Sequence, residues 1–299
     1  MDRLDTMRVF VAVAEARGFA AGARRLALSA PVVTRAVAAL ERRLGTRLLQ
    51  RTTRIVRLTE AGNRYLADCR RILAEVDSAE ETLRSPDGQP RGTLHVTASR
   101  IFGRMFVAPI VLDFLEAHRE VTVRTLLDDH VVDLIEAGVD VAVRIGPLAD
   151  SSFTATRVGS VRRVLCASPA YLARHGTPRR PADLEALDAL VFSGASARSA
   201  WTLGSGRAVR TVRPRSLLSI NDADVIIAAA IAGHGVARVL SYQVGEAVAA
   251  GTLVRLLTPF EPPPIPVSVV CPAGRNSTPK VRAFSDFAVA RLRAASWLS

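Results

Sequence analysis

A run of arginines near the N-terminus carries the clearest chemistry in this sequence. Between Gly18 and Arg57, nine arginines stand against one acid, Glu41, so the stretch holds a net charge of +8 within a chain of 299 residues and net charge +12. Guanidinium groups bind phosphate oxygens and can pair with guanine through two hydrogen bonds. We therefore interpret the stretch as a DNA-binding head, with a solvated basic face as the alternative. The arginines are Arg24, Arg25, Arg35, Arg42, Arg43, Arg47, Arg51, Arg54 and Arg57.

Three predicted helices would position these arginines. Apolar residues recur every three or four positions over residues 4–16, a short helix follows over 19–27, and a third spans 32–44 after a turn. The third helix fits the major groove in size, and its outer face is expected to read DNA. Helix-turn-helix units that bind no DNA are the alternative, which the charge disfavours. The expected core face is Val33, Val37, Leu40 and Leu44, and the expected outer face is Pro31, Thr34, Arg35 and Ala38.

Residues 48–59 alternate around a polar centre, a pattern that predicts a small hairpin, or wing. Arg51 and Arg54 lie near its tip and could reach phosphates or an adjacent minor groove, where narrow A·T tracts attract arginine.

A long helix is predicted over residues 59–84, with a single apolar seam of period near 3.5. Such a seam favours a partner helix, most simply the same helix of a second copy. Packing against its own domain is the alternative. Residues 85–92, rich in proline and glycine, are predicted to form a hinge. The seam residues are Ala61, Tyr65, Cys69, Ile72, Val76, Ala79 and Leu83.

The rest of the chain alternates between strands and helices, which predicts parallel sheets flanked by helices in two α/β lobes. The expected strands are 94–98, 121–127, 140–145, 163–167, 190–192, 236–240 and 267–270. The expected helices are 106–118, 131–137, 169–174, 222–231, 242–249 and 279–295.

A small-molecule site is expected between the lobes, because ligands of open α/β sheets bind beyond the carboxyl ends of the strands. A helix start after Ser99 could offer donors to an anion, and Arg144 could bind a carboxylate, which favours a small organic acid. Capping or salt bridging by the same side chains is the open alternative for each. The candidates are Ser99, Arg100, Asp128, Arg144, Phe192, Ser193, Asn221 and Asp222.

Other classes of protein find little support. The glycines near Gly233 and Gly194 do not complete a dinucleotide loop or a nucleophile elbow, and the histidines show no metal spacing, so we expect no enzyme, metal or cofactor. The three cysteines lack CxxC spacing, which fits reduced thiols. No signal peptide or membrane span is expected, which favours the cytoplasm. A plain solute-binding protein is the alternative, which the basic head disfavours.

The run GFAAGARRLALSAPVVTRAVAALERRLGTRLLQRTTRIVRLTEAG, residues 18–62, resembles the winged helix-turn-helix of LysR-type transcriptional regulators. The resemblance implies that Ala30, Pro31, Thr34 and Arg35 contact DNA, with Arg54 as the wing contact. Many members carry glutamine at the position of Ala30, and a methyl group cannot make the two adenine contacts of an amide. Gly22 is expected to weaken the second helix.

The same resemblance implies the organisation of the whole chain. It comprises a mainly α winged head (1–58), a linker helix for dimerisation (59–84), a hinge (85–92) and a periplasmic-binding-protein-like α/β effector domain (93–299). Lobe I is expected at about 93–160 and 266–299 and lobe II at about 161–265, with crossover strands near 153–160 and 264. The implied partners are double-stranded DNA, a small-molecule effector, further copies in a dimer or tetramer, and RNA polymerase.

Overall fold

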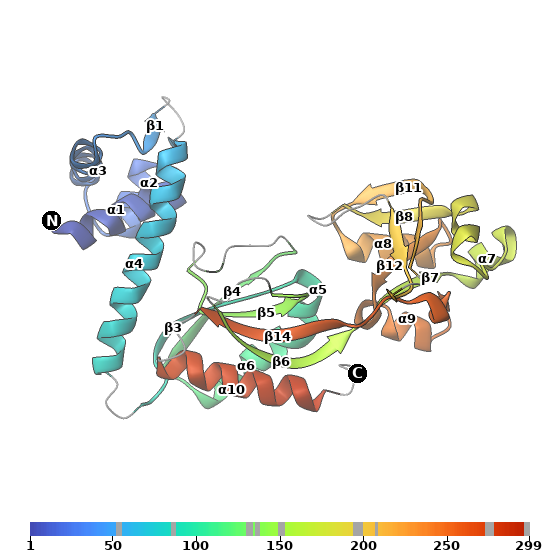
Figure 1. The fold of residues 1–299 in the computed structure, drawn as a ribbon. Helices are drawn as coiled ribbons and strands as arrows, with labels where there is room; N and C mark the ends of the chain where they lie inside the picture. The colour runs from blue at the N-terminus through green and yellow to red at the C-terminus, as the bar shows by residue number, and fades with distance from the viewer. Residues whose placement is uncertain are drawn as a thin grey trace.

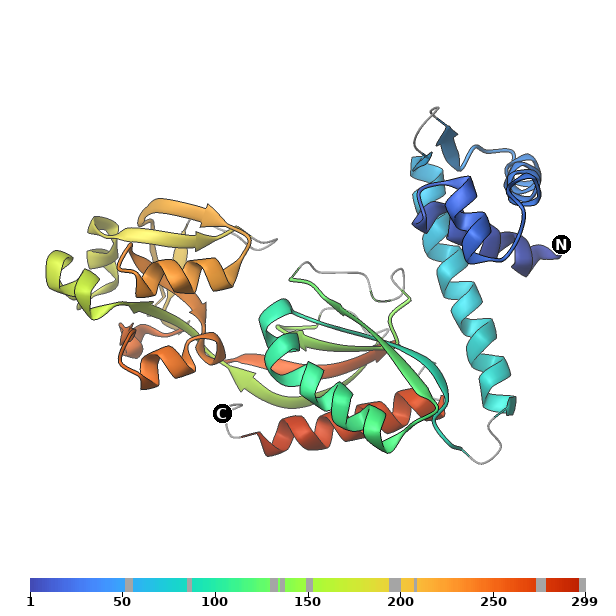
Figure 2. The same cartoon turned by 180° about the vertical axis from the view of Figure 1, so that it is seen from behind.

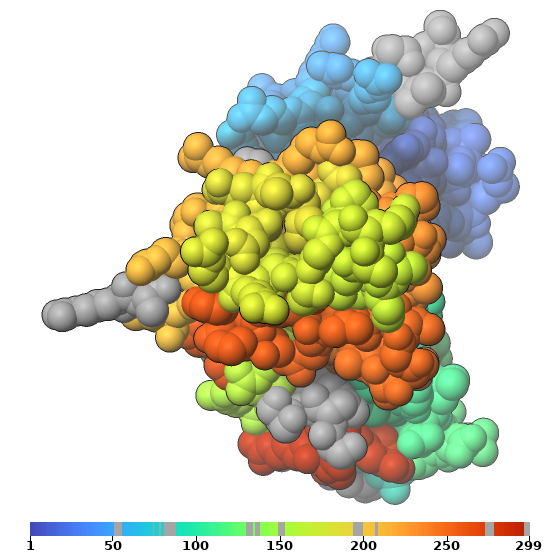
Figure 3. All heavy atoms as spheres, turned by 90° about the vertical axis from the view of Figure 1, so that its right-hand side faces the viewer, coloured from blue at the N-terminus to red at the C-terminus, as the bar shows by residue number. Residues whose placement is uncertain are grey.

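The computed structural model describes residues 1–51, 56–84, 88–129, 134, 138–148, 153–193, 200–206, 209–272 and 278–295. Along the chain it forms a helical head, a long helix and two α/β lobes joined by crossing strands (Figure 1). Viewed from the lobe II end, the molecule shows lobe II in front of lobe I, with the head projecting beyond them (Figure 3). No helix in the described part of the chain is long and apolar enough to cross a membrane.

The head has the predicted order of helices followed by a hairpin. Its elements are α1 (Arg3–Glu15), α2 (Phe19–Arg25), α3 (Ala30–Leu44), β1 (Leu49–Arg51) and β2 (Val56–Leu58). Gly22 is the point where α1 and α2 cross, since a Cβ there would lie 2.9 Å from the Val13 Cα. A glycine that weakens an isolated helix thus permits close helix packing in the head.

Helix α4 (Glu60–Arg84) packs against the head along its first half. Leu66 and Cys69 belong to the head core, and Glu15 of α1 accepts a 3.0 Å hydrogen bond from Arg70. The prediction that the whole seam faces a second copy is therefore wrong for Cys69, which is fully buried within its own chain. Beyond this region Val76 is half-buried and Ala79 is exposed, and neither belongs to the head core.

The close approach of α4 to the wing depends on Gly62. A Cβ at this position would collide with the Leu48 carbonyl oxygen, a backbone atom that cannot rotate away. We expect Gly62→Ala to destabilise the head by about 1–3 kcal/mol, because the helix must shift to make room. Urea unfolding measures this. Gly245→Ala is the control, since its new Cβ would meet open space, and an equal loss in both variants would contradict the prediction.

Lobe I contains a five-stranded sheet in the order β4-β3-β5-β14-β6. Helices α6 and α10 lie beside each other against it (Figure 2). Its elements are β3 (Gly92–Ala98), α5 (Arg100–Phe102), a π-helical turn (Gly103–Val107), α6 (Ala108–Ala117), β4 (Val121–Leu127), β5 (Val141–Ile145), β6 (Phe153–Val161), β14 (Ile265–Pro272) and α10 (Pro279–Ala294). The helix expected from residue 106 thus begins at Arg100, and the helix expected at 131–137 lies, apart from Leu134, outside the described residues.

Lobe II contains a second five-stranded sheet, in the order β11-β8-β12-β7-β13. Its strands are β7 (Arg163–Ala167), β8 (Asp188–Phe192), β9 (Trp201–Leu203), β10 (Arg210–Val212), β11 (Arg215–Ile220), β12 (Val236–Leu240) and β13 (Val254–Leu256). Its helices are α7 (Pro169–His175), α8 (Ala223–Ile231) and α9 (Gly245–Ala249), with short 3₁₀ turns at Pro181–Ala186, Ser241–Gln243 and Thr258–Phe260.

The predicted parallel pairing holds for part of each sheet, but both sheets also contain antiparallel strands. In lobe I, β3 is parallel to β4 and β5, but β14 is antiparallel to β5 and β6. In lobe II, β7 is likewise antiparallel to β12 and β13. The chain enters lobe II through β6 and returns through β14, so these paired strands must run in opposite directions (Figure 1).

Candidate nucleic-acid interface and lobe junction

The expected recognition face of α3 is exposed. Ala30, Pro31 and Arg35 are exposed and Thr34 is half-buried, whereas Val33 and Val37 on the opposite side are completely buried. The Thr34 hydroxyl donates a 2.9 Å hydrogen bond to the Ala30 carbonyl oxygen, so its hydrogen is used within the helix. The Thr34 methyl and the oxygen lone pairs are left for a partner.

Leu44 does not face the core as predicted, because its exposed fraction is 40%. The helix ends there, and Gly45 adopts a left-handed backbone with φ of 65°, which turns the chain away. Leu40, one turn earlier, is the last core residue of α3.

The wing is an antiparallel pair of β1 and β2, with Gln50 opposite Arg57. Arg51 is the last residue of β1. Arg54, the predicted wing contact, lies outside the described residues.

Glu41, the single acid of the basic stretch, has a structural role that the charge pattern did not reveal. Its Oε1 accepts hydrogen bonds from the backbone amides of Leu48 at 2.8 Å and Leu49 at 3.0 Å. Both leucines are buried, so Glu41 joins the recognition helix to the start of the wing.

We expect Glu41→Ala to destabilise the head by about 1–3 kcal/mol, because two amides at buried residues lose their acceptor. Glu41→Gln retains a carbonyl oxygen at the same place and should cost less. Chemical denaturation followed by circular dichroism measures both. Glu60→Ala is the control, because among the described residues its carboxylate makes only an exposed ion pair with Arg64. Equal stability of Glu41→Ala and the control would exclude this role.

Two ion pairs connect the lobes near the predicted effector residues. Arg100 donates to an Asp222 carboxylate oxygen at 3.0 Å, and Arg104 donates to Asp224 at 3.1 Å. Asp222 also caps α8, since its other oxygen accepts from the Asp224 amide at 2.9 Å. For Arg100 and Asp222 the structure therefore shows salt bridging, and for Asp222 also helix capping, which were the alternatives to effector contact.

Ser99 lies at the start of the same helical run. Its Oγ is buried and makes no well-formed hydrogen bond among the described residues, although the Tyr242 hydroxyl lies beside it. Burial raises the pKa of Tyr242 well above its ordinary value, and the neighbouring Ser99 hydroxyl opposes that shift. Tyr242 is therefore neutral at physiological pH.

The other candidates surround this junction on different elements. Asp128 is half-buried after β4, and its amide donates to the Ala98 carbonyl oxygen at 3.0 Å, so the ends of β3 and β4 meet. Phe192 ends β8 and packs against the cores of both lobes. Ser193 and Asn221 are exposed in lobe II.

Arg144 lies on β5, half-buried. Its neighbour Val143 belongs to the core shared with α6 and α10, so Arg144 lies on the other face of the sheet. Burial lowers the pKa of Arg144. The structure thus brings Ser99, Arg100 and Asp222 together. Arg144 follows Val143, the register partner of Ala98, so it lies next to the end of β3 that leads into Ser99.

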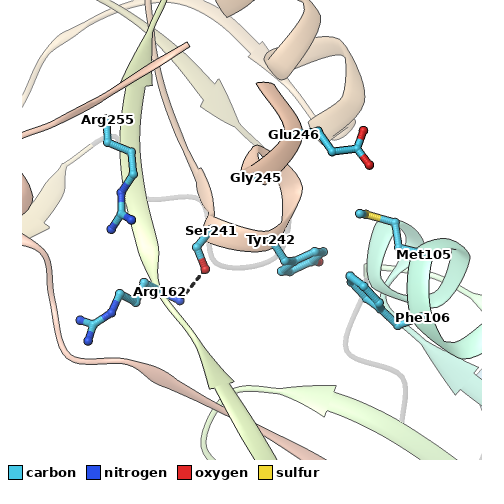
Figure 4. Close-up of a pocket in the computed structure, with 8 residues that line it drawn as sticks. All are labelled: Met105, Phe106, Arg162, Ser241, Tyr242, Gly245, Glu246 and Arg255. Carbon is cyan, nitrogen blue, oxygen red and sulfur yellow. Dashed lines mark hydrogen bonds between the residues drawn. The ribbon is translucent and has the colours of Figure 1, made fainter. Parts of the chain in front are cut away.

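A cavity of about 430 Å³ opens beside the lobe junction (Figure 4). The Arg162 amide donates to the Ser241 hydroxyl at 3.1 Å along its wall. Sequence reasoning missed this site, although Ser241 and Tyr242 directly follow the predicted strand 236–240 and the strand-end rule could have found them. The lining residues are Met105 and Phe106 from lobe I and Arg162, Ser241, Tyr242, Gly245, Glu246 and Arg255 from lobe II.

An aromatic cluster closes the junction. Tyr242 of lobe II meets Phe102 with a centroid separation of 5.3 Å and Phe106 with one of 5.8 Å. Phe102 is completely buried, and both Tyr242 and Ala223 are part of the lobe I core. The lobes therefore share apolar packing as well as ion pairs.

Comparison with known proteins gives two matching family models. The one described as "Bacterial regulatory helix-turn-helix protein, lysR family" matches residues 4–63, and the one described as "LysR substrate binding domain" matches residues 87–293. An HTH-type transcriptional regulator of Xanthomonas campestris pv. campestris is 36% identical over 295 residues, covering 97% of this chain and 86% of the relative.

Solved full-length structures are similar throughout. The Vibrio cholerae virulence activator AphB, described as a member of the LTTR protein family, has a TM-score of 0.65 and 27% identity, covering 97% of this chain and 99% of that one. CrgA, a LysR-type transcriptional regulator from Neisseria meningitidis, has a TM-score of 0.62 and 29% identity, covering 96% and 98%.

Proposed function

Since the chain belongs to the LysR family of transcriptional regulators, which have a DNA-binding head and an effector-binding domain and are not enzymes, we propose specific roles for its residues. Arg35 reads a guanine in the major groove, Thr34 contacts a phosphate or a thymine methyl group, and Arg51 and Arg54 contact the backbone or the adjacent minor groove. Ala30 and Pro31 approach the bases by apolar contact alone. The exposed face of α3 opposite fully buried Val33 and Val37 is the observation that supports this most directly.

The effector is proposed to be a small organic acid that binds between the lobes. Ser99, Arg100, Asp128, Arg144, Phe192, Ser193, Asn221 and Asp222 remain the proposed contacts. Because Arg100 is paired with Asp222, an acidic effector that engages Arg100 would compete with a contact between the lobes. Effector binding is thereby linked to the relative position of the lobes, and a coupling of about 1–3 kcal/mol would change DNA affinity roughly 5- to 150-fold.

Two copies are proposed to pair through the part of α4 beyond the head core, giving a dimer or a tetramer that binds an interrupted palindrome. We keep the division into head (1–58), linker (59–84), hinge (85–92) and effector domain (93–299) as part of this proposal, and we place the protein in the cytoplasm with RNA polymerase as a further partner. Of the proposed hinge, the structure describes residues 88–92. Residues 85–87, which connect them to α4, lie outside the described residues.

Genome-wide mapping of bound DNA, with and without candidate organic acids, tests the function. Discrete sites whose occupancy or spacing changes with one acid are expected. Binding that is uniform across sequences would overturn the proposed base-reading role. An unaltered effector response in Ser99→Ala and Arg144→Ala proteins would remove those residues from the effector site.

A further inference from the structure

Two arginines lie side by side on one face of the lobe II sheet. In the antiparallel pairing of β7 and β12, Arg163 stands opposite Leu240 and Arg238 stands opposite Leu165. The arginines are therefore diagonal neighbours, which is within reach for long side chains.

The face that carries them is not the one covered by α8. Val164 and Val239, which alternate with the arginines, pack with Ile226 of α8, whereas Leu165 and Val236 belong to the core on the opposite side. Arg163 and Arg238 share this opposite face because side chains alternate along a strand. Arg238 lies two residues before the carboxyl end of β12, which runs parallel to β8, and that end is where α/β sheets bind ligands.

Among the residues that the structure describes, neither side chain has a counter-charge. Both arginines are half-buried, the Arg238 Nε is fully buried without a partner, and among the described residues neither guanidinium forms an ion pair or hydrogen bond. Two other lobe II arginines are paired with carboxylates, Arg215 with Asp188 and Arg255 with Glu261.

Burying such groups unpaired is costly, and it is more costly when two like charges are adjacent. Burial, and secondarily the charge of Arg163, lower the pKa of Arg238 to about 10, and burial lowers the pKa of Arg163. Both groups nevertheless remain cationic at neutral pH.

We propose that Arg163 and Arg238 together bind the acidic group of a small anionic ligand. Two planar guanidinium groups can each donate two parallel hydrogen bonds, which suits a carboxylate, phosphate or sulfate group. The identification of this ligand with the regulatory effector rests on the proposed function, whereas anion binding itself does not. The pair would then hold the acid from lobe II, whereas sequence reasoning gave this role to the helix start after Ser99 and to Arg144, both in lobe I.

Calorimetric titration of the full-length protein without DNA, at fixed ionic strength in chloride, tests the proposal. The probes are inorganic phosphate, inorganic sulfate, acetate and succinate. Saturable binding of at least one is expected, weakened about tenfold or more in Arg163→Gln/Arg238→Gln. Arg162→Gln is the matched control, because it removes a neighbouring positive charge that lines the cavity of Figure 4 instead.

The outcomes separate the possibilities. Binding by succinate or acetate but not by the inorganic anions supports an organic acid, and the reverse supports a free inorganic anion at the same pair. No saturable binding, or an equal loss in Arg162→Gln and in the double variant, would overturn the proposal.

A second variant tests whether a loss of anion binding could instead come from misfolding. Arg238→Met should be at least as stable as the wild type in chloride, since it removes an unpaired cation and keeps an aliphatic side chain. A large drop in its ligand-free melting temperature would show that Arg238 is satisfied within the protein, and this would also overturn the proposal. Operator binding, measured separately on the same variants, distinguishes failure of the anion site from failure of the DNA-binding function.

Discussion

Arg35→Ala is expected to weaken binding to operator DNA by about 1–3 kcal/mol for each head, or roughly 5- to 150-fold, because a two-hydrogen-bond contact to guanine is lost. Binding to random DNA should fall much less, since phosphate contacts supply most of that affinity. Arg35 is exposed on α3, and among the described residues no ion pair or hydrogen bond holds its side chain, so the substitution should leave the fold intact. Electrophoretic mobility shift assays on both DNAs measure the difference.

Arg42→Ala serves as the control for Arg35, because it removes one positive charge from the last turn of the same helix. Arg54→Ala should weaken binding to both DNAs with less change in sequence preference, as expected of a wing contact. Equal losses on operator and random DNA for Arg35→Ala would contradict the proposed base-reading role.

Phe102→Ala is expected to destabilise the effector domain by about 3–5 kcal/mol, because it empties a completely buried site in the lobe I core. The loss should also loosen the lobes, since Phe102 packs edge to face against Tyr242 of lobe II. Chemical denaturation measures the first effect, and protease sensitivity between the lobes measures the second.

Leu112→Ala in α6 is the matched control, because this leucine has 64% of its surface exposed and should cost little. Phe102→Leu should lie between the two, since it fills part of the space. A Phe102→Ala protein as stable as the Leu112→Ala protein would show that the junction does not depend on this ring.

The helices and strands with a clear hydrophobic period were predictable from the sequence. Where the observed elements differ from the predicted ones, the difference has an identifiable cause. Strand β4 has the predicted bounds, because 121–127 ends on both sides at polar residues. This helical run begins at Arg100, six residues before the predicted start, since Arg100, Gly103 and Arg104 interrupt the apolar pattern. Gly103 and Arg104 lie in a π-helical turn. Short strands such as β9 and β13 were missed because three residues hold no usable periodicity.

The candidate sites were predictable to different degrees. The outer face of α3 followed from local spacing alone, so Arg35 could be placed. The Arg100 and Asp222 pair joins residues 122 positions apart, and nothing local indicates that they meet. Arg163 and Arg238 are neighbours because of the register between β7 and β12, which cannot be read from the sequence alone.

The burial of Leu66 and Cys69 in the head core determines where this protein can be divided to build hybrid regulators. A junction after residue 63, the end of the matched helix-turn-helix region, would separate both side chains from the head. The core around Phe10 and Val13 would then lose its own Leu66 and Cys69. A junction after residue 84 keeps α4 with the head. The unit that can be exchanged between regulators is therefore longer than the surface that meets DNA, and a transplanted head carries the whole of α4 with it.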